Sequence, residues 1–209
     1  MTTAWLAGGS GLVGGVLLRR LLDDPHFTKV TSVGRRRLPL EHPRLAQVLG
    51  DLSPASLEPL PPADVAFCCL GTTIRKAGTR DAFRAVDYGA VLAFARAARG
   101  KGVRVFAHVS SLGADPRSRA FYLAVKGEIE RDVEALGFPS AYALRPSMLD
   151  GERAESRPAE RIGLAVMRAV GPLLGRWRPT KVDAVARAMI AAAKAPAPGA
   201  HVLDAGALR

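Results

Sequence analysis

The chain of 209 residues contains 48% hydrophobic and 23% charged residues, a composition that is typical of globular proteins and excludes an intrinsically disordered chain. Its 30 Lys and Arg residues outnumber 19 Asp and Glu residues, and the formal charge of +11 points to nucleic acid, an anionic membrane surface or phosphorylated ligands as partners. Because the basic residues are spread along the chain, with Arg35-Arg36-Arg37 as the one run of three, we favour a solvated basic surface.

The cysteines and histidines indicate neither a disulfide framework nor a metal site. Cys68 and Cys69 are adjacent in a predicted buried strand, and the four histidines lack the spacing of metal ligands. The apolar N-terminal stretch lacks the basic segment of a signal peptide, and no window reaches about 18 uninterrupted apolar residues. We therefore expect a cytoplasmic protein without a membrane span.

The first predicted strand, residues 3–7, runs into a glycine-rich turn and then into a helix over residues 12–22. Glycines spaced G-x-x-G-x-x-G let the chain turn sharply, bring peptide N–H groups close to a pyrophosphate and pack the helix against the strand. The free N–H groups and positive dipole end of the helix favour the same anion. If the glycine motif is considered by itself, an ordinary tight turn between strand and helix is the alternative interpretation. The candidate dinucleotide-binding residues are Gly8, Gly9, Ser10, Gly11, Leu12, Val13 and Gly14.

The second predicted strand, residues 29–33, ends in a basic segment. At this place in a dinucleotide site, an acidic residue binds a free ribose 2′-hydroxyl and a cation accommodates a 2′-phosphate. The chain has Arg35 and Arg36 there and no acidic residue, which favours NADP(H) over NAD(H). Arg35 is the better candidate because a planar guanidinium matches phosphate oxygens, and a basic surface loop is the alternative.

The third predicted strand, residues 46–49, is followed by Asp51 and Leu52. These two residues could hold the adenine amino group and ring, and a turn-forming Asp fits the same position nearly as well. The connection over residues 53–64 contains four prolines, so any helix in it is short.

The remaining chain continues to alternate short apolar runs with longer helical patterns. The further predicted strands are residues 65–70, 103–109, 141–144 and 201–203, and the helices are residues 80–99, 120–136, 160–174 and 182–193. This alternation indicates repeated βαβ units. The predicted fold is α/β, a Rossmann-like doubly wound parallel sheet of about seven strands with helices on both faces. One domain spans residues 1–209, with a small substrate-side region at about 146–180. Ligands of such sheets bind at the carboxyl ends of the strands.

Ser110 and Ser111 end the fifth strand, and Tyr122 and Lys126 follow at helical spacing i and i+4, which places them on one face. A free tyrosine has a pKa near ~10, and a nearby ammonium lowers it by stabilising the phenolate, which makes Tyr122 a usable acid or base. Ser111 would then hydrogen-bond the substrate oxygen, and Lys126 could also hold the nicotinamide ribose. A core tyrosine beside an exposed lysine is the alternative for this spacing alone. The serine pair and the glycine turn favour the catalytic interpretation.

Together these motifs resemble those of the short-chain dehydrogenases/reductases, and the chain is similar to the small atypical group of the human HIV Tat-interacting protein and bacterial NAD(P)-binding oxidoreductase relatives. The matching segments cover roughly residues 5–185 in order, as residues 7–14, 33–36, 70–73, 86–88, 109–115, 122–128 and 144–146. The resemblance implies a Rossmann-like fold, NADP(H) and a Ser-Tyr-Lys site. It also implies that Leu70, Gly71, Thr72 and Thr73 pass near the pyrophosphate or nicotinamide, and that Arg145 and Pro146 border the nicotinamide and the substrate pocket.

The sequence departs from the family pattern in two places. Asp87 stands where many members carry an asparagine that organises a proton relay to the lysine. A carboxylate there could pair with Lys126 or lie too far away to matter. The region after the sixth strand is short, which argues against a large nucleotide-sugar substrate.

Two segments near the C-terminus leave several functions open. Arg153 and Arg157 lie in a charged loop and could meet an anionic substrate group, although a solvated loop is the favoured interpretation. The apolar helix over residues 162–174 is compatible with a homodimer contact, a substrate lid or a membrane-surface contact, and core packing is the favoured interpretation.

The sequence therefore predicts an NADP(H)-dependent oxidoreductase for a small carbonyl or alcohol substrate. The alternative is an NADP(H)-binding regulatory or redox-sensing protein that works through a protein partner. Specific nucleic-acid binding is disfavoured because the chain carries no helix-turn-helix, zinc-finger or aromatic RNA-binding motif.

Overall fold

The computed structural model describes residues 2–150 and 179–208. Seven of its strands form one parallel sheet in the order β3-β2-β1-β4-β5-β6-β9, which confirms the predicted doubly wound α/β fold. The strand order reverses between β1 and β4, so the crevice for a ligand is expected at their carboxyl ends. The strands are β1 (Thr2–Ala7), β2 (Phe27–Gly34), β3 (Leu45–Leu49), β4 (Val65–Cys68), β5 (Val105–Val109), β6 (Ser140–Arg145) and β9 (Gly199–Asp204).

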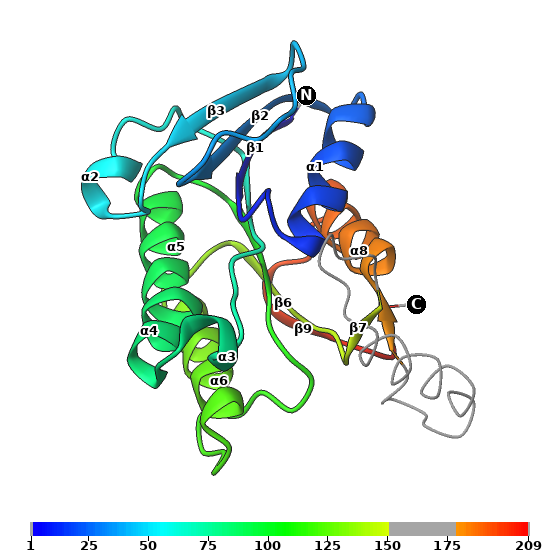
Figure 1. The fold of residues 1–209 in the computed structure, drawn as a ribbon. Coiled ribbons are helices and arrows are strands. Elements are labelled where there is room, and N and C mark those ends of the chain that lie inside the picture. Colours follow the sequence, from blue (N-terminus) through cyan, green and yellow to red (C-terminus); the bar gives the residue numbers. More distant parts are fainter. Residues whose placement is uncertain (1, 151–178, 209) are drawn as a thin grey trace.

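Helices cover both faces of the sheet. Figure 1 shows α1 (Leu12–Asp23) beside α8 (Val182–Lys194) on one face, and α5 (Val91–Gly100) beside α6 (Phe121–Glu134) on the other. The shorter helices are α2 (Pro54–Leu57), α3 (Ile74–Ala77), α4 (Arg80–Arg84) and the π-helical segment η1 (Ala85–Ala90). Within the described residues, none of the helices combines the length and the apolar character that crossing a bilayer requires.

The central strands are buried on both faces, which explains their nearly continuous apolar sequence. In β4, Val65 and Phe67 pack into the core under α1 and α8, whereas Ala66 and Cys68 pack into the core under α5 and α6. Trp5 is fully buried in the core under α5 and α6, and its indole Nε1 donates a hydrogen bond to the Pro61 carbonyl oxygen at 2.9 Å.

Three local features differ from the sequence predictions. The helix expected over residues 80–99 is continuous in space but consists of α4, η1 and α5, with a π-helical segment in the middle. The short helix α3 was not predicted. Neither was the two-stranded pair of β7 (Leu149–Asp150) and β8 (Thr180–Lys181), because strands of two residues have no detectable periodicity. Arg153, Arg157 and the helix expected over residues 160–174 lie outside the described residues.

Candidate active site

The glycine turn after β1 has the close packing that the motif predicts. Gly8 has a φ of +85°, and an added Cβ there would stand 2.5 Å from the Cys69 carbonyl oxygen. A Cβ on Gly14 would stand only 2.1 Å from the Gly8 carbonyl oxygen, so α1 packs directly against the turn. Side chains at these two positions are therefore excluded by backbone atoms.

The N-terminus of α1 is open to an anion. Its N-cap is Gly11, which provides no side-chain hydrogen bond, and the first turn contains no acidic residue. Ser10 and Gly11 are exposed. The N-terminal end of the helix thus has neither a capping side chain nor a competing carboxylate in its first turn, which suits the pyrophosphate of a dinucleotide.

The arginine segment after β2 lies beside this turn. Arg35 and Arg36 are exposed, and the chain then returns so that the Leu38 side chain lies 3.1 Å from the position of a Cβ on Gly9. After β3, Asp51 accepts a hydrogen bond from the Ser53 backbone N–H at 3.0 Å, as a turn-forming Asp does. Leu52 has a φ of +67° and a buried side chain in the core cluster that contains Trp5.

Tyr122 and Lys126 share one face of α6. The Tyr122 ring packs against Phe83 of α4 with 5.6 Å between ring centroids. The Lys126 side chain is only 5% exposed. Burial works to lower the pKa of Lys126, but the Asp87 carboxylate and the neighbouring Tyr122 outweigh it, so the pKa of Lys126 lies above its ordinary value.

Asp87 pairs with Lys126, which decides the question that the sequence left open. Its Oδ1 lies 2.7 Å from the Lys126 Nζ, and its Oδ2 accepts a hydrogen bond from the Thr72 backbone N–H at 2.7 Å. A Cβ on Gly71 would stand 3.9 Å from the same Nζ. The lysine therefore lies against the segment after β4, where the resemblance places Leu70, Gly71, Thr72 and Thr73 near a cofactor.

The two serines at the end of β5 have different surroundings. Ser110 is buried, and its hydroxyl hydrogen-bonds the Glu130 carboxylate. Ser111 is half-buried, and its Oγ donates a hydrogen bond to the Leu112 carbonyl oxygen at 3.4 Å. Of the two serines, Ser111 is thus the more exposed one.

The loop that carries Ser111 is held against α6. The Asp115 backbone N–H donates to the Leu123 carbonyl oxygen at 3.2 Å, and a Cβ on Gly127 would stand 2.2 Å from the Asp115 carbonyl carbon. Close packing at Gly127 therefore brings the loop alongside the helix that carries Tyr122 and Lys126.

Glu130 is a residue that the sequence interpretation missed. Arg145 at the end of β6 donates from its Nε to Glu130 Oε1 at 3.0 Å, and this hydrogen bond raises the pKa of Arg145. Glu130 stands at i+4 from Lys126, so its place on the same helix face was readable from the sequence. Its hydrogen bonds orient Arg145 and Ser110, and Pro146 beside them is buried.

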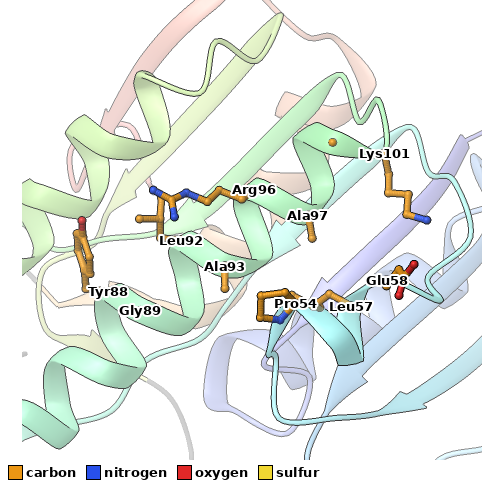
Figure 2. A pocket seen from close by; sticks show the side chains of 11 residues that line it. Pro54, Leu57, Glu58, Tyr88, Gly89, Leu92, Ala93, Arg96, Ala97 and Lys101 are labelled. Atoms are coloured by element: carbon orange, nitrogen blue, oxygen red, sulfur yellow. The ribbon is translucent and has the colours of Figure 1, made fainter.

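A separate groove lies away from these residues. It has a volume of about 520 Å³ and runs between α2 and the helix formed by η1 and α5, with Pro54, Leu57, Tyr88 and Leu92 among its lining residues (Figure 2). None of the predicted site residues lines it. The candidate site residues therefore lie outside this groove.

His108 in β5 is a buried imidazole that sequence reasoning did not single out. It is 2% exposed, and neither ring nitrogen has a hydrogen-bond partner among the described residues. Burial, with a smaller effect of Lys126, lowers its pKa from 6.5 to about 3, so the native state holds it neutral. An unpartnered imidazole in a core lowers stability because its desolvation is not compensated.

We predict that His108 makes the protein less stable in acid. Between pH 6.5 and about 3 the unfolded chain binds a proton that the native state excludes, so stability falls as pH falls, by about 1.4 kcal/mol per pH unit at most. His108→Leu should raise stability at neutral pH and reduce the loss between pH 7.5 and 5, as measured by urea unfolding. An equal loss in both proteins would show that His108 is not the cause.

The sequence of this chain is similar to those of proteins from rat and from fungi. No family model matches the sequence. The rat protein HTATIP2 is 43% identical in an alignment that covers 76% of this chain and 67% of HTATIP2. The Fmp52 protein of Coccidioides immitis is 34% identical in an alignment that covers 95% of this chain and 88% of that protein. The chain belongs to the HTATIP2-related atypical short-chain dehydrogenases/reductases.

Solved structures give the same fold for this HTATIP2-related protein. The Bordetella bronchiseptica enzyme WbmH, in complex with NAD+, aligns with a TM-score of 0.74 at 18% identity, over 99% of this chain and 76% of WbmH. MoeE5, in complex with UDP-glucose and NAD, aligns with a TM-score of 0.75 at 22% identity, over 96% of this chain and 75% of MoeE5. These two structures thus share the Rossmann-like fold of this chain.

The prediction of a cytoplasmic location is wrong. The Fmp52 relatives, such as those of Aspergillus niger and C. immitis, are named mitochondrial proteins. The prediction rested on the lack of a secretory signal, and mitochondrial targeting uses a different, amphipathic and Arg-rich type of segment.

Proposed function

We propose that this chain is an NADP(H)-dependent oxidoreductase that acts on a small carbonyl or alcohol. The observation that carries the proposal is the position of the Lys126 Nζ. Lys126 is on the same face of α6 as Tyr122, and its Nζ lies against Gly71. Gly71 follows β4, next to the glycine turn whose helix has no side-chain cap.

The residues of the site have separate roles in this reaction. A bound nicotinamide would supply or accept the hydride. Tyr122 donates a proton to the substrate oxygen or takes one from it, and Lys126 stabilises the phenolate that results. The Ser111 hydroxyl hydrogen-bonds the same oxygen and orients the substrate. Gly8, Gly11 and the N-terminus of α1 would hold the pyrophosphate.

The short connection between β6 and α8 supports a small substrate. It spans residues 146–181, which leaves little chain at this place for a separate substrate domain. A direct test follows NADPH oxidation by the purified protein across a panel of small aldehydes and ketones. A panel without any turnover would argue against this function.

Arg35 is proposed to select the 2′-phosphate of NADP(H). Arg35→Ala should weaken NADPH binding by about 10- to 100-fold, the value of a charge-assisted hydrogen bond, and leave NADH binding unchanged. Arg37→Ala is the matched control, because it removes the same charge from the same exposed segment. Fluorescence titration of both cofactors measures the effect. NADH binding as tight as NADPH binding in the unmodified protein would refute this choice of cofactor.

A second candidate function is cofactor binding without turnover, in a regulator that a protein partner recognises. The Asp87–Lys126 pair favours it, because the carboxylate compensates the charge that would activate Tyr122. Tight NADPH binding, no turnover in the carbonyl panel and the capture of a protein whose binding depends on NADPH would together support this function instead.

A further inference from the structure

A buried ion pair joins three elements that meet at the candidate site. Asp87 comes from η1, Lys126 from α6, and the Thr72 backbone N–H from the segment after β4. The side chains of Asp87 and Lys126 are 1% and 5% exposed. The two carboxylate oxygens of Asp87 have different partners: Oδ1 forms the ion pair with the ammonium, and Oδ2 accepts the hydrogen bond from the peptide N–H.

The helix segment that carries Asp87 is itself unusual. Residues Ala85–Ala90 are π-helical, whereas α4 before them and α5 after them are regular α-helices. Single π-helical turns in α-helices occur frequently at functional sites. Asp87 is the buried residue of this segment. In the helix formed by α4, η1 and α5, the π-helical turn is thus the place where a charged side chain, that of Asp87, enters the interior.

The other groups near Lys126 do not replace Asp87. The pKa of Cys68 on β4 is raised to about 12 by burial, so it is a neutral thiol near pH 7. His108 on β5 is neutral because burial lowers its pKa to about 3. Among the described residues around Lys126, Asp87 makes the largest contribution that opposes the effect of burial on the pKa of Lys126, ahead of Tyr122.

We propose that Asp87 is a positioning residue, which keeps the buried Lys126 protonated and ties it to Thr72 in the segment after β4. The inference rests on the proposed function in so far as Lys126 acts on Tyr122. Through this pair, the position of Lys126 depends on the position of the segment after β4, which in the proposed function lies near the cofactor. Loss of Asp87 leaves a lysine that burial drives toward its neutral form, and a neutral amine cannot stabilise a phenolate.

Direct titration of Lys126 tests the charge. With lysine labelled at the ε-carbon, NMR should show that Lys126 loses its proton at least about one pH unit lower in Asp87→Asn than in the unmodified protein. Asp132→Asn is the matched control, because Asp132 is a carboxylate on α6 that hydrogen-bonds Tyr88 and not Lys126. It should leave the titration unchanged. An identical titration in Asp87→Asn would overturn the proposal.

A double-mutant cycle tests the pair without any assay of activity. Asp87→Asn and Lys126→Met should each raise the unfolding equilibrium constant by on the order of 100-fold, because each leaves one buried charge unpaired. In the double variant, the unfolding equilibrium constant should rise much less than the product of the two single increases. If the double variant folds and one of the single variants does not, this result also supports the pair. Additive effects, or failure of all three to fold, would overturn it.

The pH profile of turnover separates this inference from the proposed function. In Asp87→Asn, kcat/KM should decline at a lower pH than in the unmodified protein and in Asp132→Asn, because Lys126 becomes neutral there. If the NMR titration shifts but no protein turns over a carbonyl, the proposed function fails and the role of Asp87 in holding a charged lysine stands. If turnover is present and its pH profile is the same in all three proteins, the role of Asp87 fails.

Discussion

Replacing Tyr122 by phenylalanine is expected to lower the rate of carbonyl reduction by about 10²- to 10⁴-fold, the usual contribution of a positioned proton donor. The change removes only the hydroxyl, and the ring keeps its contact with Phe83, so the site should otherwise be intact. NADPH binding is expected to be unchanged. Steady-state kinetics with a substrate from the carbonyl panel, together with fluorescence titration of NADPH, measures both quantities.

Tyr88→Phe is the matched control for this experiment. The Tyr88 hydroxyl donates to Asp132 at 2.6 Å, and Tyr88 lines the separate groove that contains none of the predicted site residues, so loss of this hydroxyl should not alter turnover. Equal activity of Tyr122→Phe and the unmodified protein would remove Tyr122 from the mechanism. Equal losses in both tyrosine variants would indicate a general structural effect.

Gly14→Ala is expected to destabilise the protein by about 3 kcal/mol and to abolish NADPH binding, because overpacking against backbone cannot be relieved by a side-chain rotation. The new Cβ would stand 2.1 Å from the Gly8 carbonyl oxygen, so the turn itself must move. Urea unfolding and NADPH titration measure the two effects.

The neighbouring Gly15 provides a control in the same helix. A Cβ at Gly15 would stand 3.5 Å from the Gly9 carbonyl oxygen, which is ordinary contact. Gly15→Ala should therefore be neutral or stabilise the protein by up to about 1 kcal/mol, since alanine favours helix more than glycine does. If both alanine variants fold and bind NADPH alike, the close approach of α1 to the turn is not needed for binding.

Local sequence patterns were sufficient for the fold and for much of the candidate site. Apolar runs and helical periodicity placed all seven strands of the sheet, and most boundaries agree within a few residues. The spacing of Tyr122 and Lys126 placed both on one helix face because helix geometry depends only on near neighbours. The glycines of the first turn were recognised for the same reason, since the strain they relieve is local.

The pattern could not show how distant residues meet. Asp87 could have been a surface carboxylate, and only the packing of η1 against α6 places it on Lys126. His108 carries no sequence signal for its lack of partners, because hydrogen bonding in the interior depends on neighbours from several elements. The expected cytoplasmic location was wrong because targeting is recognised by other proteins and does not follow from the packing of this domain.

By itself the sequence determined the order of strands and helices, the glycine-rich turn after β1 and the tyrosine–lysine spacing, because dihedral preference and periodicity act over a few residues. Only the tertiary structure decided that Asp87 pairs with Lys126, that Glu130 contacts Ser110 and Arg145, and that His108 is buried without a hydrogen-bond partner among the described residues. These properties depend on burial and on charges brought together from separate elements, and such interactions exist only after the chain has folded.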